Sequence, residues 1–330
     1  MSSEKYHIQG ATMILNNLII LKFLTYFIMD SIKQQLSKQA LNIFTEYETL
    51  IMIVYDYVLY HFPKKYAFNT KKQKYNAILI ITELIYLNKT GISYENYRGP
   101  VNAKTLNKHS LFFAEYTIFK NVYALMHVEY SKYNSFSKFK YQSTDTSYIM
   151  NINGKEGLGR NTHFKNKNCY KISMIVDSNR IPHSTIITAG NHNDAKIGLT
   201  NIDTINEYIN IKNGIHKPYL LADKMYDTND FRNECIEVGY KPIIDYNKRN
   251  TKNKKLIKKL TKKQRKTYKK RIKVENTFCI IKKYKRIRFI YDSYLSTYTS
   301  FLYLAECCMI RKYLVKPKIR YHIESQYINI

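Results

Sequence analysis

The spacing of apolar and polar residues divides the chain into a helical first part and a mixed second part. Before residue 135, apolar positions recur at helical intervals, in one stretch from Lys71 through Leu87 that breaks at Thr90-Gly91 and another from about Asn102 to Tyr123. After residue 136, short apolar runs alternate with amphipathic stretches. We therefore expect a helical extension over 1–63, a helical domain over 64–135, an α/β domain over 136–315 and a tail over 316–330.

Within the second part, the pattern predicts a sheet with helices between its strands. The helices are expected at 194–208, with Asp194 as its N-cap, at about 228–238, and in a basic stretch around Glu275. The order is strand, strand, strand, helix, strand, helix, strand, helix, which favours an α/β fold with a mixed sheet flanked by helices. The expected strands are 139–145, 170–176, 183–188, 218–222 and 240–245.

Two of these strands are expected to end in an acid, the first at Asp145 and the fourth at Asp223. Adjacent central strands would bring these carboxylates together at one edge of the sheet, and the basic helix would add Glu275. Converging carboxylates repel one another unless cations neutralise them, so such a cluster predicts Mg2+ or Mn2+ bound through oxygen. The alternative is that Asp145 and Asp223 are ordinary acids capping turns.

The surroundings of Glu275 carry a spaced motif, Y-x2-R-x3-E-x6-K, formed by Tyr268, Arg271, Glu275 and Lys282. On a helix these four side chains fall within an arc of about 60°, so one face presents a carboxylate beside a guanidinium, an ammonium and a phenol. Between residues 248 and 288 there are twenty Lys or Arg and one acid, Glu275. The alternative is a simple contact between Glu275 and Arg271 one helical turn apart.

Composition adds a polyanionic partner to this picture. The chain has 330 residues, a formal net charge of +29 and 45% hydrophobic residues, which excludes a disordered chain and favours phosphate neutralisation as a source of binding affinity. Abundant Lys, Asn, Ile and Tyr also fit an AT-rich genome, which would raise the charge for unrelated reasons. Concentration of charge between residues 248 and 288 is therefore more informative than the total.

The cysteines and the apolar stretches indicate where in the cell the protein is located. Five cysteines without a C-x2-C pair indicate neither a disulfide framework nor a zinc site, so we expect a reducing cell interior. The apolar stretch from Ala11 to Met29 is interrupted by polar residues, and we expect a packed helix there, or a misassigned start, in preference to a membrane span. An apolar segment from Tyr298 to Ile310 is expected to form a helix that packs back on the core.

The helical part offers a weak DNA-binding pattern. Its spacing permits a helix-turn-helix in which Asn102, Lys104, Asn107 and Lys108 face DNA. Three helices packed together without any role in DNA binding explain the same pattern.

Beyond these acids, three further segments carry a family resemblance. They are Leu221-Ala222-Asp223-Lys224-Met225-Tyr226-Asp227, where Met225 stands at a position that is usually glycine, Tyr170 to Asp177, and Gly190-Asn191-His192-Asn193-Asp194. With Asp145 and the Tyr268/Arg271/Glu275/Lys282 motif, residues 139–313 resemble an insertion-sequence transposase of the DDE class, in the group with a Tyr-Arg-Glu-Lys signature.

This resemblance implies a ribonuclease H-like fold and metal-dependent DNA chemistry. Asp145, Asp223 and Glu275 would be the catalytic residues and would bind two Mg2+ or Mn2+ ions, while Tyr268, Arg271 and Lys282 would contact DNA phosphates. Expected partners are double-stranded DNA, both the terminal inverted repeats and the target, and a second copy in a dimer assembled on DNA. We expect no membrane association, and a location inside a prokaryotic or host cell.

Two other functions remain open on these residues. A nuclease or resolvase with the same fold would cut branched or damaged DNA, although the Tyr268/Arg271/Lys282 set argues against it. An inactivated transposase relic would bind DNA without cutting it, although all three acids are present. We assign His192 a structural role in the loop before the helix at Asp194, because hard divalent cations prefer oxygen ligands.

Overall fold

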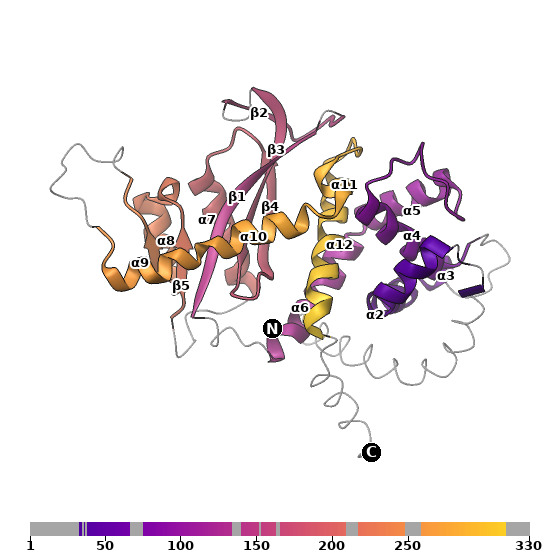
Figure 1. Cartoon of the computed structure of the whole chain (residues 1–330), viewed down its shortest axis with the longest axis horizontal. Helices are drawn as coiled ribbons and strands as arrows, with labels where there is room; N and C mark the ends of the chain where they lie inside the picture. Colours follow the sequence, from indigo (N-terminus) through magenta and orange to yellow (C-terminus); the bar gives the residue numbers. More distant parts are fainter. Residues whose placement is uncertain are drawn as a thin grey trace, which may run out of the picture. The chain divides into compact units, whose positions relative to one another are not determined.

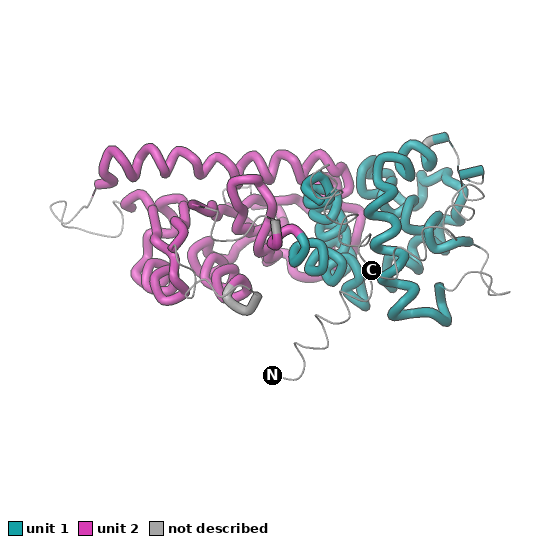
Figure 2. Tube along the Cα trace, turned by 90° about the horizontal axis from the view of Figure 1, so that it is seen from below, with its two compact units in different colours: residues 1–129, 296–330 teal, residues 130–295 magenta. Residues whose placement is uncertain are grey.

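The computed structural model describes residues 33–34, 36, 38–66, 75–133, 140–151, 153–162, 166–208, 217–247 and 259–314. Our expectations for the Ala11–Met29 stretch, for the basic residues 248–258 and for the tail 316–330 lie outside these residues. The chain forms two compact units, one comprising Met1–Glu129 with Ser296–Ile330 and the other Tyr130–Leu295 (Figure 2). Our sheet domain was drawn to residue 315, whereas residues 296–314 fall in the first unit.

The first unit is built from helices around α4, which is buried along most of its length. Asn76 caps its start by accepting a hydrogen bond from the backbone N–H of Ile78 at 2.8 Å. Gly91 ends it in the left-handed conformation, with φ of 67°, so the predicted break at Thr90-Gly91 is confirmed. The helices are α2 (Lys38–His61), α3 (Pro63–Tyr66), α4 (Ala77–Thr90), α5 (Ala103–Glu115), α6 (Ile118–Tyr133) and α12 (Leu295–Leu314).

The single helix expected from Asn102 to Tyr123 is wrong, because the chain breaks between α5 and α6. Thr117 adopts a left-handed conformation with φ of 48°. No glycine or proline marks this position in the sequence. The break lets the buried rings of Phe113 and Phe119 pack together, with 5.2 Å between their centres. This packing accounts for the strained backbone of Thr117.

The C-terminal helix α12 packs with helices of its own unit. The side-chain amide of Asn88 in α4 donates to the carbonyl of Phe301 at 3.1 Å, and the thiol of Cys307 donates to the carbonyl of Phe119. The expected helix is therefore confirmed, and its buried apolar positions belong to the helical unit. Within the described residues, no helix has both the length and the apolar character needed to cross a membrane.

The second unit contains a six-stranded mixed sheet, so the predicted α/β fold is confirmed. The strand order is β2-β3-β1-β5-β6, and β4 also pairs with β3. Strand β1 lies in the middle, antiparallel to β3 and parallel to β5, which is in turn parallel to β6. The strands are β1 (Tyr141–Met150), β2 (Gly159–Asn161), β3 (Lys167–Val176), β4 (Pro182–Ala189), β5 (Tyr219–Ala222) and β6 (Lys241–Ile244).

Asp145 lies in the middle of β1, and the expectation that the strand ends there is wrong. The residues after it continue to pair with β3, from Thr146 opposite Ser173 to Met150 opposite Cys169. Threonine and tyrosine favour extended backbone, and the pairing with a buried neighbour holds this polar segment in the sheet. Strand β5 does end where predicted, directly before Asp223.

Helices cover both faces of this sheet. Behind it, Ile202 of α7, Phe231 of α8 and Leu220 of β5 belong to one buried cluster. In front, α9, η6 and α10 follow one another directly and cross β1 (Figure 1). The elements are α7 (Asp194–Tyr208), η3 (Lys224–Tyr226), α8 (Asn229–Val238), α9 (Lys262–Tyr268), η6 (Lys269–Arg271), α10 (Ile272–Ile281) and α11 (Lys285–Arg288).

Candidate active site

Strand β1 directs neighbouring side chains to opposite faces of the sheet. The carboxylate of Asp145 meets Arg271 at the end of η6, whereas the hydroxyl of Thr146 donates to Asp194 at the start of α7, at 3.1 Å. This alternation is the ordinary consequence of the pleat of a strand. It places Asp145 on the face that α10 covers, which is the face on which Glu275 was expected.

Arg271 joins the acids of β1 and α10. Its Nη1 donates to Oδ2 of Asp145 and its Nη2 donates to Oε1 of Glu275, both at 2.6 Å. The contact between Arg271 and Glu275 is the one-turn helix contact considered above as an alternative. It does not stand alone, because the same guanidinium holds Asp145, and two of the three predicted site acids therefore share one cation.

The carboxyl group of Asp145 is in an unfavourable place for a charge. Its pKa is raised to about 6, mainly by burial and to a smaller extent by the nearby carboxylate of Asp223. The backbone N–H of Thr146, at 2.8 Å, and Arg271 act in the opposite direction. Burial outweighs these contacts, so the pKa of Asp145 stays above its ordinary value even with Arg271 beside it, and a further positive charge would lower it.

Asp223 follows β5, the parallel neighbour of β1. Its Oδ1 accepts a hydrogen bond from the backbone N–H of Met225 at 3.0 Å and so caps the short helix η3. Met225 is 47% exposed and does not have a positive φ, so this turn takes a methionine without strain. Asp223 is near enough to raise the pKa of Asp145, but among the described residues Arg271 donates its side-chain hydrogen bonds to Asp145 and Glu275 and not to Asp223.

The fit of this cluster to a divalent cation depends on Arg271. Among the described residues, no three His, Cys, Asp or Glu side chains lie close enough together to hold one metal ion. Asp145 and Glu275 instead form ion pairs with the guanidinium of Arg271. This cation supplies the positive charge that a largely buried carboxylate requires. The donor set of carboxylate oxygens still suits Mg2+ or Mn2+ in its chemistry.

The remaining members of the motif line the same face. Lys282 donates to the hydroxyl of Ser147 at 2.7 Å and to the carbonyl of Tyr148 at 3.4 Å, and burial lowers its pKa. Tyr268 is half-buried, and burial raises its pKa. All four motif residues are thus near β1, with Lys282 held by the strand that carries Asp145.

Residues 139–307, which include all of these groups, match the family model described as "Transposase DDE domain". The chain belongs to this family. It is therefore a DDE transposase, an enzyme of phosphoryl transfer that acts on DNA, and its mixed sheet flanked by helices is consistent with the ribonuclease H-like fold. Comparison with curated proteins gave no match. Comparison with solved structures also gave none.

The sequence did not reveal a buried ion pair on the other face of the transposase sheet. Lys171 is 3% exposed, and its ammonium donates to Asp194 at 2.7 Å and to the carbonyl of His192. The side chain of Asn193, and not that of Asp194, accepts a backbone N–H in the first turn of α7, from Ala195 at 2.9 Å, so the expected N-cap is wrong by one residue. A lysine among the mostly apolar residues of the predicted strand 170–176 was the available signal for this pair.

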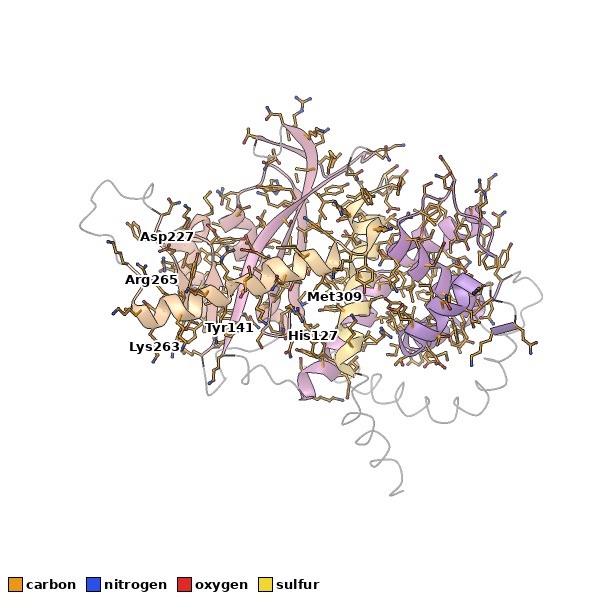
Figure 3. All side chains as sticks on the ribbon, viewed as in Figure 1. His127, Tyr141, Asp227, Lys263, Arg265 and Met309 are labelled. Atoms are coloured by element: carbon orange, nitrogen blue, oxygen red, sulfur yellow. The ribbon has the colours of Figure 1, made fainter. Side chains whose placement is uncertain are left out.

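Asp227, the last acid of the Leu221–Asp227 motif, has a structural role that the sequence did not reveal. It accepts hydrogen bonds from the Nε of Arg232 and from the backbone N–H of Asn247, both at 2.8 Å. Arg232 in turn donates to the carbonyl of Ile244 at the end of β6. Asp227, labelled in Figure 3, thus ties the loop after Asp223 to the neighbouring strand.

Before the motif, α9 presents a basic surface. Thr261 and Gln264 form a capping box that fixes where the helix begins. Every Lys and Arg of its first two turns is exposed, including Lys263 and Arg265, which project from the helix in Figure 3. Such a helix is suited to neutralising backbone phosphates.

Proposed function

We propose that this transposase cleaves the ends of an insertion sequence and joins them to target DNA. The observation that supports this most directly is the bridge from Asp145 through Arg271 to Glu275. It gathers acids from β1 and α10 into one cluster beside Asp223, in the region that matches the family. A protein that only binds DNA does not require acids gathered in this way.

Asp145, Asp223 and Glu275 are the residues that would hold two Mg2+ or Mn2+ ions. Bound divalent ions supply Lewis-acid stabilisation of the charge that develops on a phosphate under attack. For the protein, this requires that Glu275 and Asp145 become available, which means that Arg271 gives up at least one of its contacts. A DNA phosphate provides the alternative partner, since a guanidinium fork fits two phosphate oxygens as well as it fits carboxylates.

In this proposal the other motif residues orient the DNA backbone. Lys282 neutralises a phosphate as a point charge while β1 holds its position, and the phenol of Tyr268 donates a hydrogen bond to a phosphate near the cut. The half-buried setting of both groups strengthens these contacts, because a lower local dielectric weakens screening by water. Together they set the scissile phosphate against the acids.

Recognition of the element ends is proposed for the helical unit. On α5, Asn102 caps the helix by accepting the N–H of Lys104 at 3.0 Å, and Lys104 and Lys108 are exposed. These residues, with the half-buried Asn107, form the face that would enter a major groove. Two element ends have to be held together for joining, so we propose a dimer assembled on DNA.

A cleavage and joining assay tests this function. The substrate is labelled DNA carrying the inverted repeats that flank the gene, with Mg2+ and an unlabelled target duplex. We expect nicked ends and joined products from the wild type and neither from Asp223→Asn, whereas Asp203→Asn, an exposed acid on α7, retains both. Cleavage without joining would favour a nuclease, and binding without cleavage would favour a relic; either outcome refutes the proposal.

A further inference from the structure

The chain exposes three aromatic rings directly after the short helix α11, which follows the motif. Phe289 is 50% exposed, Tyr291 is 44% exposed and Tyr294 is 50% exposed, all within six residues. Leaving so much ring surface in water is unfavourable, and clusters of exposed apolar side chains commonly mark interaction sites. We call residues 283–294 the aromatic segment.

A buried ion pair fixes the backbone of this segment. Arg286 and Asp292 are almost completely buried, and the guanidinium donates from Nε to Oδ2 at 3.1 Å and from Nη2 to Oδ1 at 2.7 Å. Such a bidentate contact holds both side chains in one orientation. It closes a loop of seven residues, Arg286 to Asp292, which carries Phe289 and Tyr291, and Tyr294 follows two residues after the loop.

Further contacts anchor the segment to the sheet unit. The side-chain amide of Asn151, next to the end of β1, donates to the carbonyl of Asp292 at 3.2 Å, and the backbone N–H of Lys155 donates to the carbonyl of Ser293 at 3.0 Å. Ile287 and Ile290 point inward and are buried. The segment thus buries its two isoleucines and exposes its three rings, because the contacts that anchor its backbone direct these side chains to opposite sides.

The exposed charges within the aromatic segment are positive, although the carboxylate of Glu156 lies next to its end, at Leu295. Lys283, Lys285 and Arg288 are exposed, whereas Asp292, the only acid of the segment, is neutralised by Arg286 in the interior. The guanidinium of Arg288 lies 5.4 Å from the centre of the Phe289 ring. Arg288 is also near enough to Lys282 to contribute to the lowering of its pKa, so the segment adjoins the motif.

We propose that the aromatic segment is a stacking surface for unpaired bases of DNA. Flat rings receive bases of any sequence, and the surrounding cations receive the phosphates that connect them. We infer DNA as the partner from charge complementarity. An apolar protein surface could cover the rings, but it would not neutralise Lys283, Lys285 and Arg288. This inference rests on the proposed function, in which strands are separated from their partners next to the cut.

Binding measurements on the full-length Asp223→Asn protein test the surface without any cleavage. Two probes of equal length are compared by fluorescence anisotropy, a fully paired duplex and a duplex with three unpaired thymines. A 2-aminopurine beside the unpaired stretch reports stacking through quenching of its fluorescence. We expect tighter binding to the interrupted duplex, with quenching.

The variants are Phe289→Ala, Tyr291→Ala, Tyr294→Ala and the triple combination, each checked for an unchanged melting temperature. Each single change is expected to lower affinity for the interrupted duplex about tenfold, with little effect on the paired duplex. Phe289→Tyr should keep the affinity, and so should Tyr60→Ala, an equally exposed aromatic in the helical unit.

An unchanged preference and unchanged quenching in the triple variant would overturn the inference. So would a change of oligomeric state in light scattering without a change in base preference, which would assign the rings to a second copy of the chain. Because these assays need no metal and no catalysis, they fail or succeed independently of the cleavage and joining assay.

Discussion

The guanidinium of Arg271 lies 2.6 Å from the carboxylate of Asp145, although the two residues are 126 positions apart in the chain. In this arrangement a fixed cation neutralises the acids that are proposed to hold divalent ions. If the acids hold divalent ions as proposed, Arg271 and a metal ion would compete for the same carboxylate oxygens. DNA would then promote metal binding by drawing Arg271 to a phosphate.

Removal of this cation should increase metal affinity in the absence of DNA. We expect Arg271→Ala to bind Mn2+ about tenfold more tightly than the wild type, because a positive charge beside the site is lost, and yet to be inactive in cleavage. Isothermal titration calorimetry on DNA-free protein measures the affinity. Lys270→Ala, an exposed neighbour, is the control. Weaker Mn2+ binding in Arg271→Ala would contradict the competition.

Lys282 should matter for catalysis more than for overall DNA affinity. Lys282→Met removes its hydrogen bonds to Ser147 and Tyr148, and we expect a loss of about 1 kcal/mol in stability together with a loss of cleavage of at least about tenfold. Lys266→Met, an exposed residue of α9, should instead weaken DNA binding in a salt-dependent manner with cleavage of bound DNA preserved. Equal cleavage rates for the two variants on saturating DNA would refute this assignment.

The buried pair of Lys171 and Asp194 should be needed for stability. Lys171→Met leaves the carboxylate of Asp194 without its charged partner, and we expect a loss of about 3 kcal/mol in the free energy of unfolding by urea. Lys167→Met, at the exposed start of the same strand, should cost less than about 0.5 kcal/mol. The double variant Lys171→Met/Asp194→Asn should recover part of the loss; no recovery would mean that the two charges act independently.

Asp56 in the helical unit should make stability depend on pH. It is 8% exposed, neither of its carboxylate oxygens has a hydrogen-bond partner among the described residues, and burial raises its pKa to about 6. A folded-state pKa above the unfolded value means that the folded state holds its proton more tightly. The stability contributed by the protonated group is therefore full below about pH 4 and is lost as the pH rises to about 6.

Comparison with Asp56→Asn isolates this effect. Relative to the variant, the wild type should lose on the order of 2 kcal/mol in unfolding free energy between pH 4 and pH 7. Chemical denaturation at several pH values measures it. Glu48→Gln, an exposed acid of the same helix, should track the wild type at every pH. A pH-independent difference between wild type and Asp56→Asn would show that Asp56 does not titrate in this range.

The elements of the sheet unit could be predicted where one local pattern decides them. The buried residues of β5 end directly before Asp223, as predicted. The hairpin of β3 and β4 forms from the two predicted strands, 170–176 and 183–188. The extension of β1 beyond Asp145 could not be predicted, because its polar residues are held by pairing with β3 and by contacts such as that of Thr146 with Asp194. Those contacts depend on residues far away in the sequence.

For the site, the spacing of the motif predicted which side chains share a helix face, but not what they contact. The one-turn contact between Arg271 and Glu275 follows from the helix, whereas the contact with Asp145 depends on how α10 crosses β1. The left-handed Thr117 was unpredictable for a similar reason, since packing of Phe113 on Phe119 imposes it. The roles of the three acids remain predictions.

Helix α12 begins at Leu295, whose backbone N–H is held by the carboxylate of Glu156 in the sheet unit at 2.8 Å, and then continues as part of the helical unit. The helical unit is thus completed only by residues that follow the whole catalytic region in the chain. A ribosome finishes the catalytic segment before the proposed end-recognition unit acquires its last helix. A fragment truncated after residue 133 would consequently be a poor probe of end recognition, and a useful one would have to carry α12 grafted through a linker.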